Sequence, residues 1–199
     1  SMKRLKNPKS KVSCHYLIDR NGHVYKMIDD ANIAWHAGKS KWKNIKNLNK
    51  YSIGIEIQNK GHLINYQNFP KKQISSLIIL IKSLLKKYKI KKNCVLGHSD
   101  VAPLRKKDPG EKFPWNFLSS KGVAIWYPKF KLKKIEIKSK AKRRIFFKNV
   151  HKIGYRFFSL SQKSKRDRKI IMAFQRRFLH QEVNGKITDK TLKISQLLA

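Results

Sequence analysis

Residues 70–88 carry the strongest structural constraint in this sequence, because their apolar side chains recur at intervals of three and four. This is the spacing of one face of an α-helix. Pro70 precedes the pattern, as proline commonly does in the first turn of a helix. An apolar face of this length must be buried against another element. The residues that form it are Ile74, Leu77, Ile78, Ile81, Leu84, Leu85 and Tyr88.

Strand patterns lie on both sides of this helix. Residues 12–18 and 23–28 are rich in β-forming residues and are joined by an Asn-Gly turn, which predicts a hairpin. Residues 51–58 alternate with the period of a strand, and the apolar run 94–96 predicts another short strand. Strands that alternate with a helix favour an α/β domain with a mixed central β-sheet flanked by helices.

Changes of composition along the chain predict two domains. We assign residues 1–128 to the α/β domain and the Lys-rich residues 129–141 to a linker. Residues 142–199 carry helical apolar patterns, in which Gly154 is expected to end one helix and Thr188 to begin the last. The second domain is therefore expected to be a small all-α three-helix module.

The formal net charge of +37 invites a nucleic-acid-binding interpretation. Only ten of the 48 basic residues are Arg, the residue that best fits phosphates and base edges. The abundant Lys, Ile and Asn all have AT-rich codons, so a biased genome explains much of the charge. We therefore do not expect nucleic acid to be the target.

Two further classes of protein are excluded by composition. The longest uninterrupted apolar run, residues 77–81, is far shorter than the roughly 20 residues of a membrane span. Two cysteines, Cys14 and Cys94, are too few for a disulfide scaffold.

Glu56 is the first candidate for chemistry, because it interrupts an Ile-rich strand in a chain with only 11 acidic residues. If the carboxyl were buried, its pKa would rise toward a value that suits a general base. The alternative is a solvent-facing residue on a sheet with one buried face.

His98 and Asp108 lie close together in the segment GHSDVAPLRKKDPG. An imidazole and a carboxylate are compatible with two ligands of a hydrolytic zinc ion, although an Asp before Pro is also an ordinary turn former. Asp100 resembles a residue that orients a ligand, and a turn role is the alternative. Trp35 and His36, in AWHAG, suit a binding groove, whereas a core Trp beside a hydrogen-bonded His is the commoner case.

Four segments together resemble the zinc-dependent N-acetylmuramoyl-L-alanine amidase family, which is related to the peptidoglycan recognition proteins. They are VSCHYLIDRNGHVYKMID, AWHAGKSKW, LNKYSIGIEIQN and VLGHSDVAPLRKKDPGEKFPW, and the resemblance covers roughly residues 7–117. The C-terminal segment IGYRF…IIMAFQRRFLHQEVNGKITDKTL resembles the three-helix peptidoglycan-binding module that some of these amidases carry.

The resemblance implies a role for each candidate. In the family, two His and an Asp hold zinc, which assigns His98 and Asp108 as metal ligands. The acid of the strand matches Glu56, the base for the attacking water. The Lys two positions before the ligand Asp matches Lys106, which would stabilise the oxyanion. The resemblance places Trp35, His36 and Asn49 along the substrate groove.

One departure from the family concerns the metal. The family's other His ligand belongs to an opening strand with a pattern like I-H-Y-T. Only 14 residues precede His15 here, none of them is His, and His15 itself matches a later box. We expect the third protein ligand of the single zinc ion to be absent from this chain, and zinc binding to be weak.

The resemblance therefore predicts an enzyme that hydrolyses the amide bond between N-acetylmuramic acid and L-alanine. Its partner would be peptidoglycan or a muropeptide, in a bacterial envelope or periplasm rather than the cytoplasm, with no prediction of oligomeric state. The alternatives are a non-catalytic peptidoglycan-binding protein or an inactive truncated amidase.

Overall fold

The computed structural model describes residues 12–132, 134 and 136–199. Contacts among these residues divide the chain into two compact units. The first comprises the described residues up to 40 together with 45–94, and the second comprises 41–44 together with 95–199.

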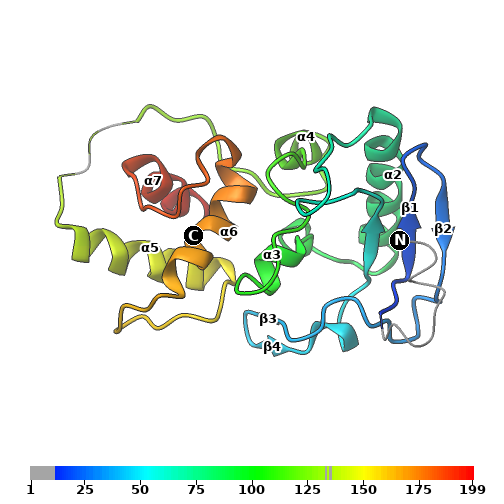
Figure 1. The fold of residues 1–199 in the computed structure, drawn as a ribbon, viewed down its shortest axis with the longest axis horizontal. Coiled ribbons are helices and arrows are strands. Elements are labelled where there is room, and N and C mark those ends of the chain that lie inside the picture. The colour runs from blue at the N-terminus through cyan, green and yellow to red at the C-terminus, as the bar shows by residue number, and fades with distance from the viewer. Residues whose placement is uncertain (1–11, 133, 135) are drawn as a thin grey trace. The chain divides into compact units, whose positions relative to one another are not determined.

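A small mixed sheet forms the centre of the first unit (Figure 1). Its middle strand β1 (Tyr16–Ile18) pairs antiparallel with β2 (Val24–Lys26) and parallel with β5 (Ile55–Ile57). The hairpin and the mixed sheet predicted from the sequence are thus confirmed. In this register Leu17 lies opposite Glu56 of β5.

Helix α2 (Lys71–Lys87) packs against β1 and confirms the predicted helix. Its predicted face is buried up to Leu84, whereas Leu85 is half-buried and Tyr88 is exposed just beyond the helix end. Gln73 lies in this buried face and donates from Nε2 to the carbonyl oxygens of Ile18 and Gln58, at 3.1 and 3.0 Å. One side-chain amide therefore ties the helix to the ends of β1 and β5.

The strand predicted at residues 94–96 is wrong. The chain there forms a 3-10 turn, η3 (Lys92–Cys94), in which the backbone N–H of Cys94 donates to the carbonyl of Lys91 at 2.8 Å. An apolar run of three residues has too little length to carry a period, so the turn was not distinguishable from a strand. The other short elements of the first unit are β4 (Ile45–Lys46) and η2 (Leu48–Lys50).

The second unit is mostly helical (Figure 1). Its core is dominated by aromatic side chains from the C-terminal helices, and α5 packs against α7. The all-α prediction for the end of the chain is thus confirmed. The elements are β3 (Lys41–Trp42), α3 (His98–Val101), α4 (Trp115–Ser120), α5 (Ser139–Ile153), α6 (Asp167–Phe178), η4 (His180–Glu182) and α7 (Asp189–Leu198).

Both predicted helix ends are confirmed. Gly154 ends α5 with a φ of 143°, a conformation that side chains other than glycine rarely adopt. Thr188 begins α7, and its Oγ1 accepts the backbone N–H of Thr191 at 3.2 Å.

The contacts do not separate the C-terminal helices from the segment before them. Helix α6 contacts both α3 and α4, and all three belong to the second unit. Helix α5 begins at Ser139, inside the predicted linker. The boundaries at residues 128 and 141 stay a prediction, as does the peptidoglycan-binding character of residues 142–199. None of the helices in the described part of the chain has the length and apolar character that crossing a bilayer requires.

A buried carboxylate joins α2 to the sheet in the first unit. Asp30 accepts hydrogen bonds from the hydroxyls of Tyr16 and Tyr88, at 2.6 and 2.7 Å, and from Lys87 at 3.1 Å. Burial alone would raise the pKa of the Asp30 carboxyl, but these hydrogen bonds outweigh it and lower the pKa to about 2.

This cluster predicts a pH dependence of stability. Because the pKa of Asp30 falls from 3.8 to about 2 on folding, its contribution is complete above about pH 4 and is lost as the pH falls toward 2. Asp30→Asn should lower the free energy of unfolding at neutral pH and flatten its rise between pH 2 and 4, measured by urea unfolding. Tyr88→Phe, which removes one of the hydrogen-bond donors to Asp30, should reduce the same rise in part. An unchanged rise in Asp30→Asn would contradict the assignment.

Candidate functional site

His98 and Asp108 are adjacent in the second unit. His98 is the first residue of α3, and its Nδ1 lies 3.0 Å from Oδ2 of Asp108. The backbone N–H of Ser99 donates to the carbonyl oxygen of Asp108 at 2.8 Å, which ties the two segments together. Nη2 of Arg105 lies 3.4 Å from Nε2 of His98. The structure therefore brings the two predicted metal ligands together, with His98 at a helix start rather than at a strand end.

Lys106 lies half-buried near this pair, with its backbone N–H donating to Ala102 at 3.0 Å. Partial burial by itself would raise the pKa of Asp108. The hydrogen bond with His98 and the charges of His98 and Lys106 outweigh burial and lower that pKa, so Asp108 is a carboxylate at neutral pH.

The pair fits two positions of a zinc site. A nitrogen and an oxygen that each lie about 2.0–2.2 Å from a tetrahedral zinc ion are roughly 3.3 Å apart, close to the distance between His98 and Asp108. Among residues 12–132, 134 and 136–199, no group of three or more His, Cys, Asp or Glu side chains could hold a metal ion. The described residues therefore offer two candidate ligands, whereas a catalytic zinc normally has three protein ligands.

Two residues near the start of the described chain, His15 and Cys14, could be considered as further ligands, and the state of each side chain argues against it. Nδ1 of His15 accepts the N–H of Gly54 at 2.9 Å, and its Nε2 lies 3.0 Å from the carbonyl of Asn32, so both ring nitrogens are used inside the first unit. Burial and the negative charge of Glu56 raise the pKa of the Cys14 thiol to about 11. Cys14 is thus a neutral thiol, whereas metals bind the thiolate.

Glu56 projects from the middle of β5 and is exposed. The solvent-facing alternative is therefore confirmed, and the interpretation that depended on burial of this carboxyl is wrong. Alternation placed Glu56 on the face opposite its Ile neighbours but could not determine whether another element covers that face.

Trp35 is 64% exposed, so the alternative of a core Trp is wrong. Its backbone is held by Ser13, whose N–H donates to the Trp35 carbonyl and whose Oγ accepts the Trp35 N–H. The ring of His36 packs directly against Gly54, where a Cβ would lie 2.3 Å from the ring. The backbone of Trp35 is thus fixed by Ser13 while its ring is exposed, and the ring of His36 packs against Gly54 in the same unit.

Asn49 is buried and points back into its own unit. Its Oδ1 accepts the N–H groups of Ala37 and Gly38, at 2.7 and 3.3 Å. The side chain predicted to contact substrate therefore holds the turn that follows Trp35 and His36.

Asp100 has partners that sequence reasoning missed. Its carboxylate, 1% exposed, accepts hydrogen bonds from Tyr155 and Arg177, which lie 55 and 77 residues further along the chain. No local pattern marks either partner, because an Arg or a Tyr in an amphipathic helical segment is ordinary. Of the two interpretations of Asp100, the buried contacts favour an orienting residue over a simple turn former.

A sequence model of the N-acetylmuramoyl-L-alanine amidase family matches residues 1–111. The chain is 32% identical over 204 residues to N-acetylmuramoyl-L-alanine amidase AmiD of Escherichia coli, covering 94% of this chain and 73% of that protein. It is 40% identical over 112 residues to 1,6-anhydro-N-acetylmuramyl-L-alanine amidase AmpD of Haemophilus influenzae, covering 55% of this chain and 59% of that relative.

Solved structures show the same similarity. A complex of E. coli AmiD with the substrate anhydro-N-acetylmuramic acid-L-Ala-D-γ-Glu-L-Lys superposes with a TM-score of 0.88 and 29% identity, over 99% of this chain and 82% of that one. AmpDh3 of Pseudomonas aeruginosa superposes with a TM-score of 0.86 and 27% identity, over 100% of this chain and 85% of that one.

The geometry of Asn49 predicts a stability effect. Asn49→Ala leaves the buried N–H of Ala37 and the N–H of the exposed Gly38 without their acceptor, so the free energy of unfolding should fall by about 2 kcal/mol. Chemical denaturation measures this fall, with the exposed neighbour variant Lys50→Ala as a control expected to change stability by less than about 0.5 kcal/mol. Equal stability of the two variants would show that the Asn49 hydrogen bonds are not needed to hold the turn.

Proposed function

The chain belongs to the N-acetylmuramoyl-L-alanine amidase family, and from this membership we propose that it hydrolyses the amide bond between N-acetylmuramic acid and L-alanine. The single observation that carries the proposal is the adjacency of His98 and Asp108, at 3.0 Å, in the segment that resembles the family's metal box. Peptidoglycan or its muropeptide fragments would be the substrate, and the bacterial envelope, where peptidoglycan lies, the place of action.

His98 and Asp108 are the residues that would hold zinc. When bound, zinc supplies Lewis-acid polarisation and lowers the pKa of water. The proposed ligands have the right chemistry for this ion, since neutral imidazole and carboxylate are both common zinc ligands.

Glu56 would act as the general base. Its carboxylate is exposed, as suits a group that exchanges protons with water. It would accept a proton from the water that attacks the carbonyl carbon, and then pass a proton to the nitrogen of L-alanine as the C–N bond breaks. Lys106 would stabilise the negative charge that develops on the carbonyl oxygen during the attack.

Trp35 and His36 would contribute to substrate binding in different ways. The exposed ring of Trp35 offers an apolar face to a sugar or peptide, whereas the ring of His36, packed against Gly54, would hold the adjacent backbone in place. Because the Oδ1 of Asn49 is already bonded to backbone N–H groups, Asn49 would act on substrate only by holding this turn.

Removing the proposed base tests the mechanism. Glu56→Gln should lower the turnover of a muramoyl-L-alanine substrate by about 10²–10⁴-fold, because the amide cannot take the proton. Released peptide, quantified by chromatography, measures the turnover. Glu136→Gln, at another exposed acid, should keep full activity. Unchanged turnover in Glu56→Gln would remove Glu56 from the mechanism.

Zinc binding tests the proposed ligands. With two protein ligands, the chain should bind zinc weakly, and His98→Ala should weaken binding by more than about 100-fold, since even residues that only orient a ligand are worth about 10–100-fold. Metal titration calorimetry measures both affinities, and His151→Ala, at an exposed histidine of α5, should match the wild type. Tight zinc binding that survives His98→Ala would show that other residues form the site.

A non-catalytic peptidoglycan-binding protein is the second candidate. It is favoured by one observation, that the described residues 12–132, 134 and 136–199 offer no third ligand beside His98 and Asp108. Such a protein would bind muropeptides with no released L-alanyl peptide, so the same chromatographic assay distinguishes the two functions.

A further inference from the structure

The carboxylate of Asp100 is buried and receives three donors within the second unit. Its Oδ1 accepts the hydroxyl of Tyr155 at 2.5 Å. Its Oδ2 accepts the guanidinium of Arg177 at 2.6 Å and the backbone N–H of Gly97 at 2.8 Å. Asp100, Tyr155 and Arg177 are 1%, 0% and 3% exposed. A carboxylate removed from water in this way is stable only while its donors are in place.

Two of these donors come from the C-terminal helices. Tyr155 directly follows the end of α5, and Arg177 lies in the last turn of α6. Arg177 also donates to the carbonyl of Val95 at 2.9 Å, and its guanidinium lies 4.0 Å from the ring centre of Trp115. Burial and the charge of Asp100 raise the pKa of Tyr155, so its phenol remains a hydrogen-bond donor.

The third donor connects Asp100 to the ligand pair. Gly97 immediately precedes His98, so the bond from Gly97 to Asp100 fixes the backbone on which the imidazole is mounted. The space at Gly97 is tight, since a Cβ there would lie 2.7 Å from Pro109, the residue after Asp108. Together with the bond from Ser99 to Asp108, these contacts leave little freedom to the segment between residues 97 and 109.

The C-terminal end of α5 also contacts the segment that contains Trp42 and Lys43. Gly154 approaches the Trp42 ring so closely that a Cβ would lie 2.4 Å from it, and the carbonyl of Gly154 accepts the N–H of Lys43 at 2.8 Å. The rings of Trp42 and Tyr155 meet edge to face at 5.0 Å. The turn after α5 is thus packed by side chains and backbone on more than one side.

We propose that Tyr155 and Arg177 are positioning residues that hold His98 in its binding geometry through the buried carboxylate of Asp100. The C-terminal helices would then stabilise the segment that carries His98 through direct hydrogen bonds. This inference rests on the proposed function only for the role of His98 as a zinc ligand. The placement of the His98 imidazole can be measured whether or not the chain is an amidase.

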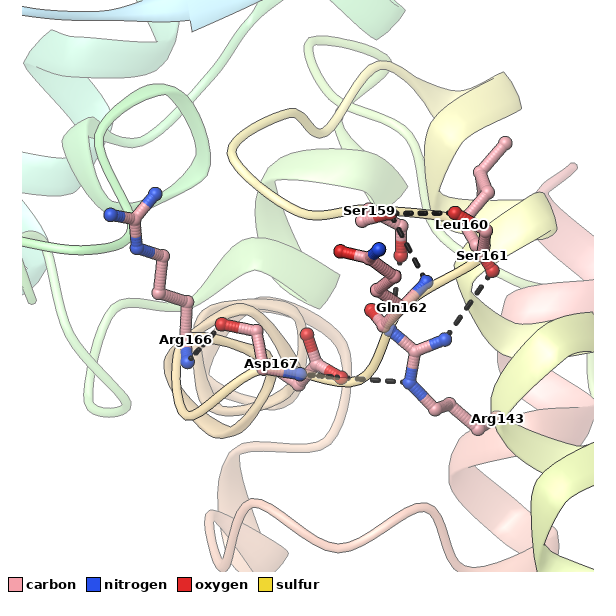
Figure 2. Close-up of polar contacts among 8 residues, drawn as sticks. Arg143, Ser159, Leu160, Ser161, Gln162, Arg166 and Asp167 are labelled. Atoms are coloured by element: carbon pink, nitrogen blue, oxygen red, sulfur yellow. Dashed lines mark hydrogen bonds and ion pairs between the residues drawn. The ribbon is translucent and has the colours of Figure 1, made fainter.

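A matched control exists in the same helices (Figure 2). Arg143 of α5 pairs with Asp167 at 2.8 Å, donates to the carbonyls of Ser159 and Gln162, and lies 4.6 Å from the ring centre of Phe147. Like Arg177, Arg143 has a largely buried side chain that makes an ion pair, donates to backbone carbonyls and contacts an aromatic ring. Unlike Arg177, it contacts neither Asp100 nor the segment that carries His98.

The experiment compares Tyr155→Phe, Arg177→Lys and Arg143→Lys in the full chain by NMR. In Tyr155→Phe and Arg177→Lys, the amide of Gly97 should exchange at least about tenfold faster relative to that of Phe174 in the core, because its acceptor is loosened. The ring signals of His98 should shift in both variants. Arg143→Lys should leave both the Gly97 ratio and the His98 signals unchanged, even where its melting temperature falls equally.

Rescue by charge supplies a second comparison. Arg177→Lys keeps a cation beside Asp100 and should show smaller changes at Gly97 and His98 than Arg177→Met. Equal responses of Gly97 and His98 in Tyr155→Phe, Arg177→Lys and Arg143→Lys would overturn the proposal. If the wild-type chain releases no L-alanyl peptide, the proposed function fails, while the exchange rates and ring signals still decide the positioning role. Tyr155→Phe loses a single hydroxyl and keeps the test valid if the Arg177 variants do not fold.

Discussion

The second unit depends on one buried carboxylate. Asp100 is almost fully removed from water, and an ionised carboxyl in that setting must be paired and hydrogen-bonded. Its donors are Gly97, three residues before it, and Tyr155 and Arg177, 55 and 77 residues after it. The chain must therefore bring the ends of α5 and α6 to the start of α3. Asp100 and all three of its donors belong to the second compact unit.

Features with a local cause could be predicted from the sequence. The apolar period predicted α2 to within a residue of its start, and an Asn-Gly turn predicted the pairing of β1 with β2. Gly154 and Thr188 end and begin their helices because the required backbone and side-chain geometry belongs to those residue types. The adjacency of His98 and Asp108 also follows from proximity, since only nine residues, Pro103 among them, separate the two.

Features that depend on distant partners could not be predicted. Alternation placed Glu56 on one face of a strand, but exposure is decided by what covers that face. Asn49 was expected to contact substrate, and its amide instead holds the turn at Ala37. The type of a residue does not reveal whether its side chain bonds to a substrate or to the protein's own backbone. The domain boundary expected at the Lys-rich residues 129–141 stays a prediction, because charge indicates solvent contact and does not report which helices pack together.

The long separation between Asp100 and its partners also orders events during biosynthesis. The strands of the small sheet and α2 all precede residue 95, so their partners exist as soon as that segment has left the ribosome. Arg177 is translated 77 residues after Asp100, a delay of roughly 4–15 s at about 5–20 residues per second. During that interval the carboxylate lacks its charged partner and has only the N–H of Gly97, water and, later, the hydroxyl of Tyr155. The nascent chain can therefore complete its sheet first, whereas the buried ion pair between Asp100 and Arg177 forms only when translation is nearly finished.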